Sequence, residues 1–430
     1  TVTVGKDVTV EKDMIFTDLY DEDGDGVDNG DLLLANEKND VTVNGKVAGI
    51  DSSATSADDN FKVYGTAGNI TTGNSKNGDV VTVGKGVLGE DDVKTDAVAG
   101  TVTMGSGEKL SDGSNTLNVN ASSYTDADDN TTEYSATVGE VKLYSKVGNT
   151  VAVNGGTEKA ATTGAITMVS EAENSLTAKN NAVIGGDVSM TSATGNTLSV
   201  KGKASVNGKV LEEEIDYNGT AAIQAKINGS VTMTSSNGSN TAALIDAALE
   251  KDISMTAEQK EDATVANNTL TIAGSSYVNK VWNAEKSEHV DNTVQQLATV
   301  GGAVSMTAAD SNTLNAELAT IGGAVKMTAE NGSNTIQGNG DDTASVITLP
   351  SLEMTAKGNN TAKFEDSAIK DTVTMTAETG DNTLTLTRTN SGKVTMTADR
   401  KNTMSVYGKF EKADEEADVP SYTRYTVGGI

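Results

Sequence analysis

A methionine that recurs in the pattern Val-x-Met-Thr constrains the fold of this chain more than any other feature of its sequence. Complete or nearly complete copies are centred on Met104, Met168, Met190, Met233, Met255, Met306, Met327, Met354, Met375 and Met396. Successive methionines lie 64, 22, 43, 22, 51, 21, 27, 21 and 21 residues apart, so most intervals are close to a multiple of about 21 residues. The intervals of 51 and 27 residues predict coils that carry loop insertions. Self-similarity at a fixed period of this length is typical of stacked structural repeats.

Less regular copies of this anchor extend the repeat along the chain. We expect Val43, Val63 and Val83 to hold the anchor position before the first methionine, at intervals of 20, 20 and 21 residues. Leu143 and Asn283 are interpreted as degenerate copies within two of the longer intervals. A repeat of this extent predicts a cooperative array of coils rather than several separate globular cores.

Two further elements accompany the anchor in most copies. An Asn-Thr pair followed by an apolar residue trails the methionine, as in Asn312-Thr313-Leu314, and a Gly-Gly pair closes a third element, as in Ile321-Gly322-Gly323. The asparagine is interpreted as a turn residue or as part of a stacked amide ladder. The methionine is interpreted as core packing, because its flexible thioether fills gaps.

Apolar and polar residues alternate with a period of two within each anchor. In the segment 304–307, which reads Val-Ser-Met-Thr, the valine and methionine point to one face and the serine and threonine to the other, as in a half-buried strand. The density of Gly and Asn would destabilise a helix. We therefore predict an all-β fold, a parallel β-solenoid (β-helix) of about twenty coils, each of about 20–22 residues, with strand-like terminal extensions.

The repeat also predicts the domain organisation. Residues 1–42 are expected to form an N-terminal strand and an acidic loop, residues 43–410 the solenoid, and residues 411–430 an acidic linker with a terminal strand that contains Tyr422 and Tyr425. Solenoid ends need capping because the last coil exposes unpaired backbone groups. The terminal strands either cap their own solenoid or pair with the next molecule, which would give a homo-oligomer or a polymer.

The charge and composition of the chain exclude several classes of binding partner and of chemistry. The chain has 61 Asp and Glu against 32 Lys and Arg, a formal net charge of −29, and a surface of this sign disfavours nucleic acid and anionic membranes. No stretch reaches 18 apolar residues, so we expect no membrane span. The absence of Cys excludes disulfides and thiolate chemistry.

One acidic segment predicts a metal site. Residues 21–31 read Asp-Glu-Asp-Gly-Asp-Gly-Val-Asp-Asn-Gly-Asp, which places carboxylates at the first, third and fifth positions and a glycine at the sixth. Calcium binds six to eight hard oxygens in flexible geometry, and this spacing resembles the Asp-x-Asp-x-Asp-Gly loops of EF-hand, dockerin and thrombospondin type 3 repeats. Leu32 stands where those loops have their last acidic ligand. The predicted calcium ligands are Asp21, Asp23, Asp25, Val27, Asp28 and Asp31; the alternative is a solvated acidic loop.

The sequence offers little support for catalysis. His289 is the only histidine, and it lies in an irregular segment without a neighbouring nucleophile motif. Paired carboxylates are plentiful, but the aromatic or basic clusters that bind sugars in β-helical glycosidases and lyases are lacking. Recurrent Thr-x-Thr pairs also suggest an ice-binding surface, yet Lys326 and Glu353 place charges in the same outward column. We therefore expect that the protein is not an enzyme.

In its period, the chain resembles bacterial extracellular β-solenoid repeat proteins of the surface-layer, adhesin and filament types. The resemblance implies an extracellular, cell-surface protein that forms or decorates a filament or surface layer by self-association, and the acidic loop at residues 21–31 adds calcium as the expected cofactor. The alternative is a β-solenoid adhesin that does not polymerise and binds a cell-surface ligand.

Overall fold

The computed structural model describes residues 1–17, 38–202, 223–260, 265–283, 288–340, 347–408 and 427–429. These residues form strands and no helix, so nothing in this part of the chain is a helix that could cross a membrane. The chain divides into two compact units. Unit 1 comprises Thr1–Ser199 with Ala225–Thr234, and unit 2 comprises Val200–Gln224 with Ser235–Ile430.

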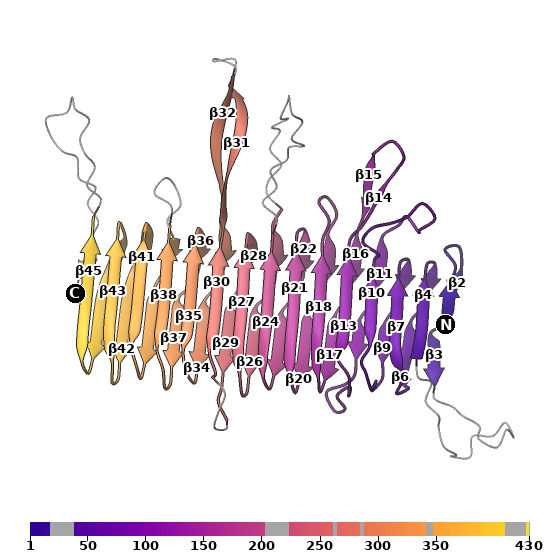
Figure 1. Ribbon diagram of the computed structural model, residues 1–430, viewed down its shortest axis with the longest axis horizontal. Helices are drawn as coiled ribbons and strands as arrows, with labels where there is room; N and C mark the ends of the chain where they lie inside the picture. The colour runs from indigo at the N-terminus through magenta and orange to yellow at the C-terminus, as the bar shows by residue number, and fades with distance from the viewer. Residues whose placement is uncertain are drawn as a thin grey trace. The chain divides into compact units, whose positions relative to one another are not determined.

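Each unit is a parallel β-solenoid, as the repeat predicts (Figure 1). A coil in unit 1 consists of β18 (Gly148–Asn154), β19 (Ala161–Thr163) and β20 (Ile166–Ser170). The next coil repeats it with β21 (Glu173–Lys179), β22 (Ala182–Ile184) and β23 (Val188–Ser192), and each strand pairs in parallel with its counterpart. The coils therefore build three ladders, called here the first, second and third ladder in chain order.

In unit 1 the three ladders begin within the first 17 residues, because β1, β2 and β3 pair with β4, β5 and β6. The first ladder contains β1 (Val2–Val4), β4 (Lys38–Val43), β7 (Asp58–Val63), β10 (Val80–Val83), β13 (Asn115–Asn120), β18, β21 and β24 (Gly195–Lys201). The second contains β2 (Thr9–Val10), β5 (Lys46–Val47), β8 (Thr66–Ala67), β11 (Ala97–Ala99), β16 (Ala136–Val138), β19, β22 and β25 (Ala225–Ile227). The third contains β3 (Met14–Thr17), β6 (Ile50–Ala54), β9 (Ile70–Thr72), β12 (Val102–Met104), β17 (Val141–Ser145), β20, β23 and β26 (Val231–Ser235).

In unit 2 the second and third ladders merge in the last coils, where one long strand serves both. The first ladder contains β27 (Ser239–Ile245), β30 (Asn268–Ala273), β35 (Asn312–Glu317), β38 (Asn334–Asn339), β41 (Asn360–Glu365), β43 (Asp381–Thr387) and β45 (Lys401–Tyr407). The others contain β28 (Ala247–Leu249), β29 (Ile253–Ala257), β33 (Ala298–Val300), β34 (Val304–Ala308), β36 (Ala319–Ile321), β37 (Val325–Ala329), β39 (Ile347–Leu349), β40 (Leu352–Ala356), β42 (Ser367–Ala377), β44 (Asn390–Ala398) and β46 (Val427–Gly429).

The described strands of the first ladder number fifteen, eight in unit 1 and seven in unit 2, against the predicted figure of about twenty coils. The difference arises because long connections take up part of the sequence. Within unit 1 they include residues 84–96 and 121–135, and the second of these contains the antiparallel hairpin of β14 (Ser122–Thr125) and β15 (Thr131–Tyr134). Within unit 2, residues 274–297 contain the hairpin of β31 (Ser275–Asn283) and β32 (Glu288–Gln296). All three connections join a first-ladder strand to a second-ladder strand.

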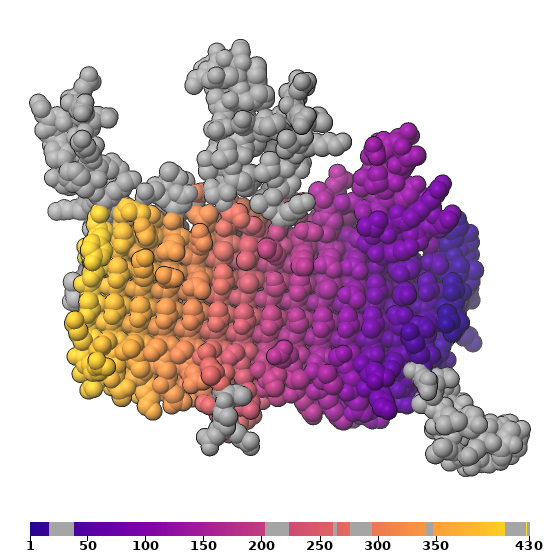
Figure 2. All heavy atoms as spheres, in the orientation of Figure 1, coloured from indigo at the N-terminus to yellow at the C-terminus, as the bar shows by residue number. Residues whose placement is uncertain are grey.

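The core of each unit is the row of inward side chains that the period-two pattern predicts. Met168 and Met190 are register partners and have no exposed surface, and Met306 is register partner of Met327 in the same way in unit 2. Outward side chains of neighbouring coils lie in parallel rows on the surface (Figure 2). The Gly-Gly element has a steric cause, because a Cβ atom on Gly322 would lie 2.2 Å from the Gly301 carbonyl oxygen.

The strand register confirms one of the five less regular copies of the anchor and shows that the other four do not hold the anchor position. Leu143 stands between Met104 and Met168 in the third ladder, as predicted. Asn283 does not hold an anchor position, because it ends β31 in the antiparallel hairpin. The valines Val43, Val63 and Val83 lie in the first ladder, whereas the register partners that precede Met104 in the third ladder are Thr72 and Ser52.

Candidate functional site

The predicted calcium ligands Asp21, Asp23, Asp25, Val27, Asp28 and Asp31 lie outside the described residues, so the calcium site stays a prediction. Among the residues that are described, no three acidic or histidine side chains form a group suited to a metal ion. The acidic cluster at 126–129 forms a turn, in which the Asp126 carboxylate accepts hydrogen bonds from the backbone N–H groups of Asp128 and Asn130, both at 2.9 Å.

A buried column of asparagines runs along the first ladder in each unit. In unit 2, the Asn312 Nδ2 atom donates to the Oδ1 atom of Asn334 at 2.9 Å and to the Thr328 carbonyl at 2.7 Å. The same pair of contacts repeats in the next coil, where Asn334 donates to Asn360 and Thr355. This is the stacked amide ladder that the Asn-Thr repeat suggested, and each amide joins two coils and two ladders. Its members in unit 2 are Asn240, Asn268, Asn312, Asn334, Asn360, Asn382 and Asn402.

In unit 1 two aspartates replace asparagines in this column. Asp59 is register partner of Asn39, and Asp79 follows in the next coil, before Asn115. The two carboxylates are 2% and 0% exposed. Asp59 accepts hydrogen bonds from Asn39 Nδ2 at 2.9 Å and from the Ser52 hydroxyl.

Asp79 is held in a similar way and is linked to Asp59 directly. Its carboxylate accepts the backbone N–H of Asp59 at 2.9 Å and the hydroxyl of Thr72. Burial, with the negative charge of Asp79 nearby, raises the pKa of Asp59 to about 7, against the stabilising hydrogen bonds of Ser52 and Asn39. Burial also raises the pKa of Asp79. Unit 1 therefore contains two buried acids whose pKa values are raised, so both bind protons more readily than exposed carboxyl groups do.

Sequence reasoning missed this pair, because it assigned the anchor positions of the first coils to Val43, Val63 and Val83, which lie in the first ladder. A signal was present. Ser52 and Thr72 stand where other coils have methionine, and each lies seven residues before its aspartate. A hydroxyl at the anchor position therefore accompanies a carboxylate in the amide column.

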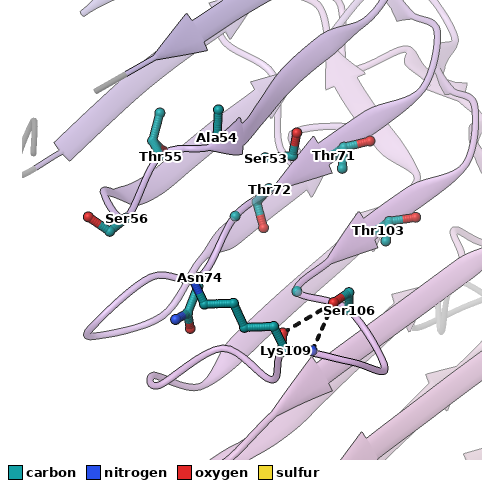
Figure 3. Close-up of a pocket in the computed structure, with 12 residues that line it drawn as sticks. Ser53, Ala54, Thr55, Ser56, Thr71, Thr72, Asn74, Thr103, Ser106 and Lys109 are labelled. Atoms are coloured by element: carbon teal, nitrogen blue, oxygen red, sulfur yellow. Dashed lines mark hydrogen bonds between the residues drawn. The ribbon is translucent and has the colours of Figure 1, made fainter. Parts of the chain in front are cut away.

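A hollow of about 520 Å³ lies on the outside of unit 1 and is connected to the buried acids through Thr72 (Figure 3). Thr71 and Thr103, which are register partners, line it from the third ladder, and Thr72, whose hydroxyl donates to Asp79, also lines it. The connection 105–114 forms one rim, on which Lys109 stands beside Ser106. Asn74 ties that rim to the coil by accepting the Asp112 N–H at 2.9 Å. Most of the lining side chains carry hydroxyl groups, and Asn74 adds an amide, Lys109 an amine and Ala54 a methyl group. This mixture of polar and apolar groups suits a ligand such as a sugar, which has hydroxyl groups and C–H faces.

At β1 and β45, the described strands of the first ladder have a partner on one side only, and apolar side chains close to them are exposed. Within the described residues, β1 pairs only with β4, and β45 pairs only with β43. Ile15 in the first coil is 69% exposed, and Tyr407 at the end of β45 is 56% exposed. The strand β46 covers part of β44 through the pairs Ser391–Val427 and Lys393–Gly429, whereas Tyr422 and Tyr425 lie outside the described residues.

The single histidine lies in the antiparallel hairpin of unit 2. His289 lies in β32 opposite Trp282, and only the backbone of these residues is described. The expectation that the protein is not an enzyme stays a prediction.

Comparisons with known proteins add no family to this picture. No protein-family model matches the chain, and neither a curated protein nor a solved structure matches it.

Proposed function

We propose that this protein is an extracellular structural component that self-associates end to end, forming or decorating a filament or surface layer. The observation that carries the proposal is the pair of open strand edges at β1 and β45, each of which has one partner among the described strands. An unpaired edge is a template for another strand. The location at the cell surface rests on the acidic, cysteine-free composition and on the period of the repeat.

The two edges fit each other in register. Val2 and Val4 occupy the same inward columns of the first ladder as Met404 and Val406, as judged from their partners within each unit. If β1 of one molecule adds to β45 of another, the inward side chains continue the core, and Thr3 lies beside Ser405 on the outside. A contact between unlike surfaces that does not close into a ring generates a filament.

A cross-link tests this contact, because the chain has no native Cys. We expect the double variant Thr3→Cys with Ser405→Cys to form covalent multimers on mild oxidation, since strands in a ladder lie about 4.8 Å apart. The matched control, Thr3→Cys with Thr361→Cys, places the second thiol in mid-ladder on β41 and should stay monomeric. Equal multimer yields from both variants, or none from either, would count against end-to-end addition.

Calcium is part of the proposal as a stabiliser of the N-terminal region. We expect Asp23→Ala with Asp25→Ala to lower the melting temperature in calcium and to leave it unchanged in chelator, while the exposed control Asp91→Ala has no effect in either. Electron microscopy of the parent with and without chelator supplies the second readout. Filaments or sheets that disperse without calcium would support the proposal, and single particles in both conditions would contradict assembly.

A second candidate is a β-solenoid adhesin that does not polymerise. It is favoured by the hydroxyl-lined hollow of unit 1 and by the long connections that leave each unit between the first and second ladders. Under this alternative, Thr71→Val with Thr103→Val should reduce binding to immobilised polysaccharide and leave the oligomeric state unchanged. The variant pair Thr150→Val with Thr177→Val, on outward positions away from the hollow, serves as the control.

A further inference from the structure

One corner of unit 2 is built by residues with an unusual backbone conformation. Asp246, Leu318, Asp366 and Arg388 have φ angles of +49°, +45°, +45° and +47°. Each follows directly after a first-ladder strand, and each donates its N–H to the carbonyl at the same place in the next coil, as Asp246 does to Ala273 at 2.8 Å. These four residues therefore occupy equivalent positions, and two of them are aspartates.

The two aspartates differ in whether a positively charged side chain lies beside the carboxylate. Asp366 receives two hydrogen bonds from Arg388, at 2.7 Å from Nε and 2.6 Å from Nη2, and so has a guanidinium partner. Asp246 is more deeply buried, at 5% exposure, and forms no ion pair within the described residues. Only its Oδ2 atom has a partner, the Ser275 hydroxyl at 2.7 Å, and its buried Oδ1 atom has none. A buried carboxylate without a counter-charge is costly.

A second unpartnered oxygen lies at the same corner. Gln296 is the register partner of Ser275 in the first pair of the β31–β32 hairpin, and its Nε2 atom donates to the Asp246 carbonyl at 3.2 Å. Its Oε1 atom is buried and has no partner among the described residues. The hairpin leaves the coil next to β30 (Figure 1), and a Cβ atom on Gly274 would lie 2.2 Å from the Gln296 carbonyl, so the packing here is close.

We propose that Asp246, Ser275 and Gln296 bind a hard, oxygen-seeking cation at the foot of the β31–β32 hairpin. The carboxylate Oδ1, the amide Oε1 and the hydroxyl oxygen supply its ligands, and the cation takes the place that the Arg388 guanidinium has beside Asp366. Oxygen ligands of this kind suit Ca²⁺, and one carboxylate with neutral oxygens also suits a monovalent ion. Because two ligands lie on the hairpin and one on the coil, binding fixes the hairpin to the solenoid.

Cation titration of the full chain tests this site. The parent for the experiment carries Asp23→Asn and Asp25→Asn, so that the predicted N-terminal loop does not contribute. Calorimetry after chelation, with CaCl₂, MgCl₂, NaCl and KCl in separate arms, should show one saturable site for one of these cations. Asp246→Asn should abolish it, and Gln296→Leu should weaken it by about tenfold or more.

Hydrogen exchange supplies a local readout that separates binding from folding. The bound cation should slow exchange at amides flanking residues 274 and 297 in the parent and in the control Asp366→Asn, which changes the equivalent aspartate. It should leave Asp246→Asn unaffected. No saturable binding by any of the four cations, or the same slowing in Asp246→Asn, would overturn the proposal. Neither outcome depends on whether the molecules associate end to end.

Discussion

The amide columns of the two units use the same position of the coil in different ways. In unit 2, every described member from Asn240 to Asn402 is an asparagine, and each link from Nδ2 to the next Oδ1 is 2.9–3.0 Å long. In unit 1, Asp59 and Asp79 interrupt the column, and the Oδ1 atom of the next member, Asn115, is buried without a partner.

The difference shows what the column requires chemically. An amide donates and accepts at once, so asparagines can be stacked without limit. An ionised carboxylate only accepts, so Asp79 cannot supply the hydrogen that Asn115 Oδ1 would take. Unit 1 compensates with donors from elsewhere, namely the hydroxyls of Ser52 and Thr72 and the Asp59 N–H. The compensation holds the acids in place but leaves their ionisation costly.

We expect the largest effect on stability when an aspartate replaces an asparagine in the amide column of unit 2, as it does in unit 1. Asn334→Asp removes three donated hydrogen bonds, to Met327 O at 3.2 Å, Thr355 O at 2.7 Å and Asn360 Oδ1 at 3.0 Å. It also buries a carboxylate beside a methionine rather than a hydroxyl. We expect a loss of about 3–5 kcal/mol in the free energy of unfolding at pH 8, measured by denaturant titration.

Two variants sharpen that result. Asn315→Asp, at an outward position of β35, is the matched control and should cost little. Adding Met327→Thr to Asn334→Asp should recover part of the loss, because it recreates the relation between Thr72 and Asp79. If Asn315→Asp lowers the free energy of unfolding as much as Asn334→Asp does, the added charge, and not its burial, is responsible.

The next effect is a pH dependence confined to unit 1. A carboxyl group whose pKa is raised on folding stabilises the native state below its unfolded value, near 3.9, and this contribution is lost as the pH rises through the folded value. With the pKa of Asp59 at about 7, the loss falls mainly between the two pKa values, from about pH 4 to about pH 7. We expect the opening free energy of unit 1 amides, from hydrogen exchange, to fall by about 2–3 kcal/mol from pH 5 to pH 7.

Unit 2 serves as the internal reference for this measurement, because its described column contains no acid. Carboxyl groups with lowered pKa values, such as those of Asp92 and Asp126, lose their contribution only at lower pH and do not interfere. Asp59→Asn should reduce the slope of the unit 1 profile, and the part that remains should come from Asp79, whose pKa is also raised. Equal slopes in both units of the parent, or an unchanged slope in the variant, would show that the buried acids are not the cause.

A smaller gain should follow when the column of unit 1 is repaired. Asp79→Asn supplies an Nδ2 donor for Asn115 Oδ1 and removes a buried charge. The amide oxygen keeps the N–H of Asp59, and the Thr72 hydroxyl, which donates to the second carboxylate oxygen in the parent, turns to accept from Nδ2. We expect a stabilisation of about 1–2 kcal/mol at pH 8, with less at pH 5, where Asp79 is more often protonated. Calorimetric unfolding at both pH values measures it, and a loss of stability at pH 8 would show that the carboxylate is required.

The sequence predicted the class of fold because the period of the repeat sets the length of a coil, and the alternation of apolar and polar residues shows which side chains of a strand point inward. It predicted Leu143 correctly, but it could not distinguish Val43 from a third-ladder residue, since inward valines occur in every ladder at the same period of about 20 residues. The pair Asp59 and Asp79 was hidden for a related reason. An aspartate beside polar residues is typical of a turn, and only the pairing of coils places it in the buried column.

We expect the smallest effect on stability from substitutions in the outward rows of side chains. Such a substitution tests whether the difference between the two units depends on burial. Lys326 and Glu353 are register partners on the outside of unit 2, with their charged groups 3.0 Å apart and their side chains about half exposed. Lys326→Ser matches the serine that stands one coil earlier, at Ser305. Because exposed ion pairs contribute little, we expect a change below about 0.5 kcal/mol in the free energy of unfolding, reduced further by salt. A loss comparable to that of Asn334→Asp would mean that charge pairing on the surface, and not the buried amide column, sets the stability of unit 2.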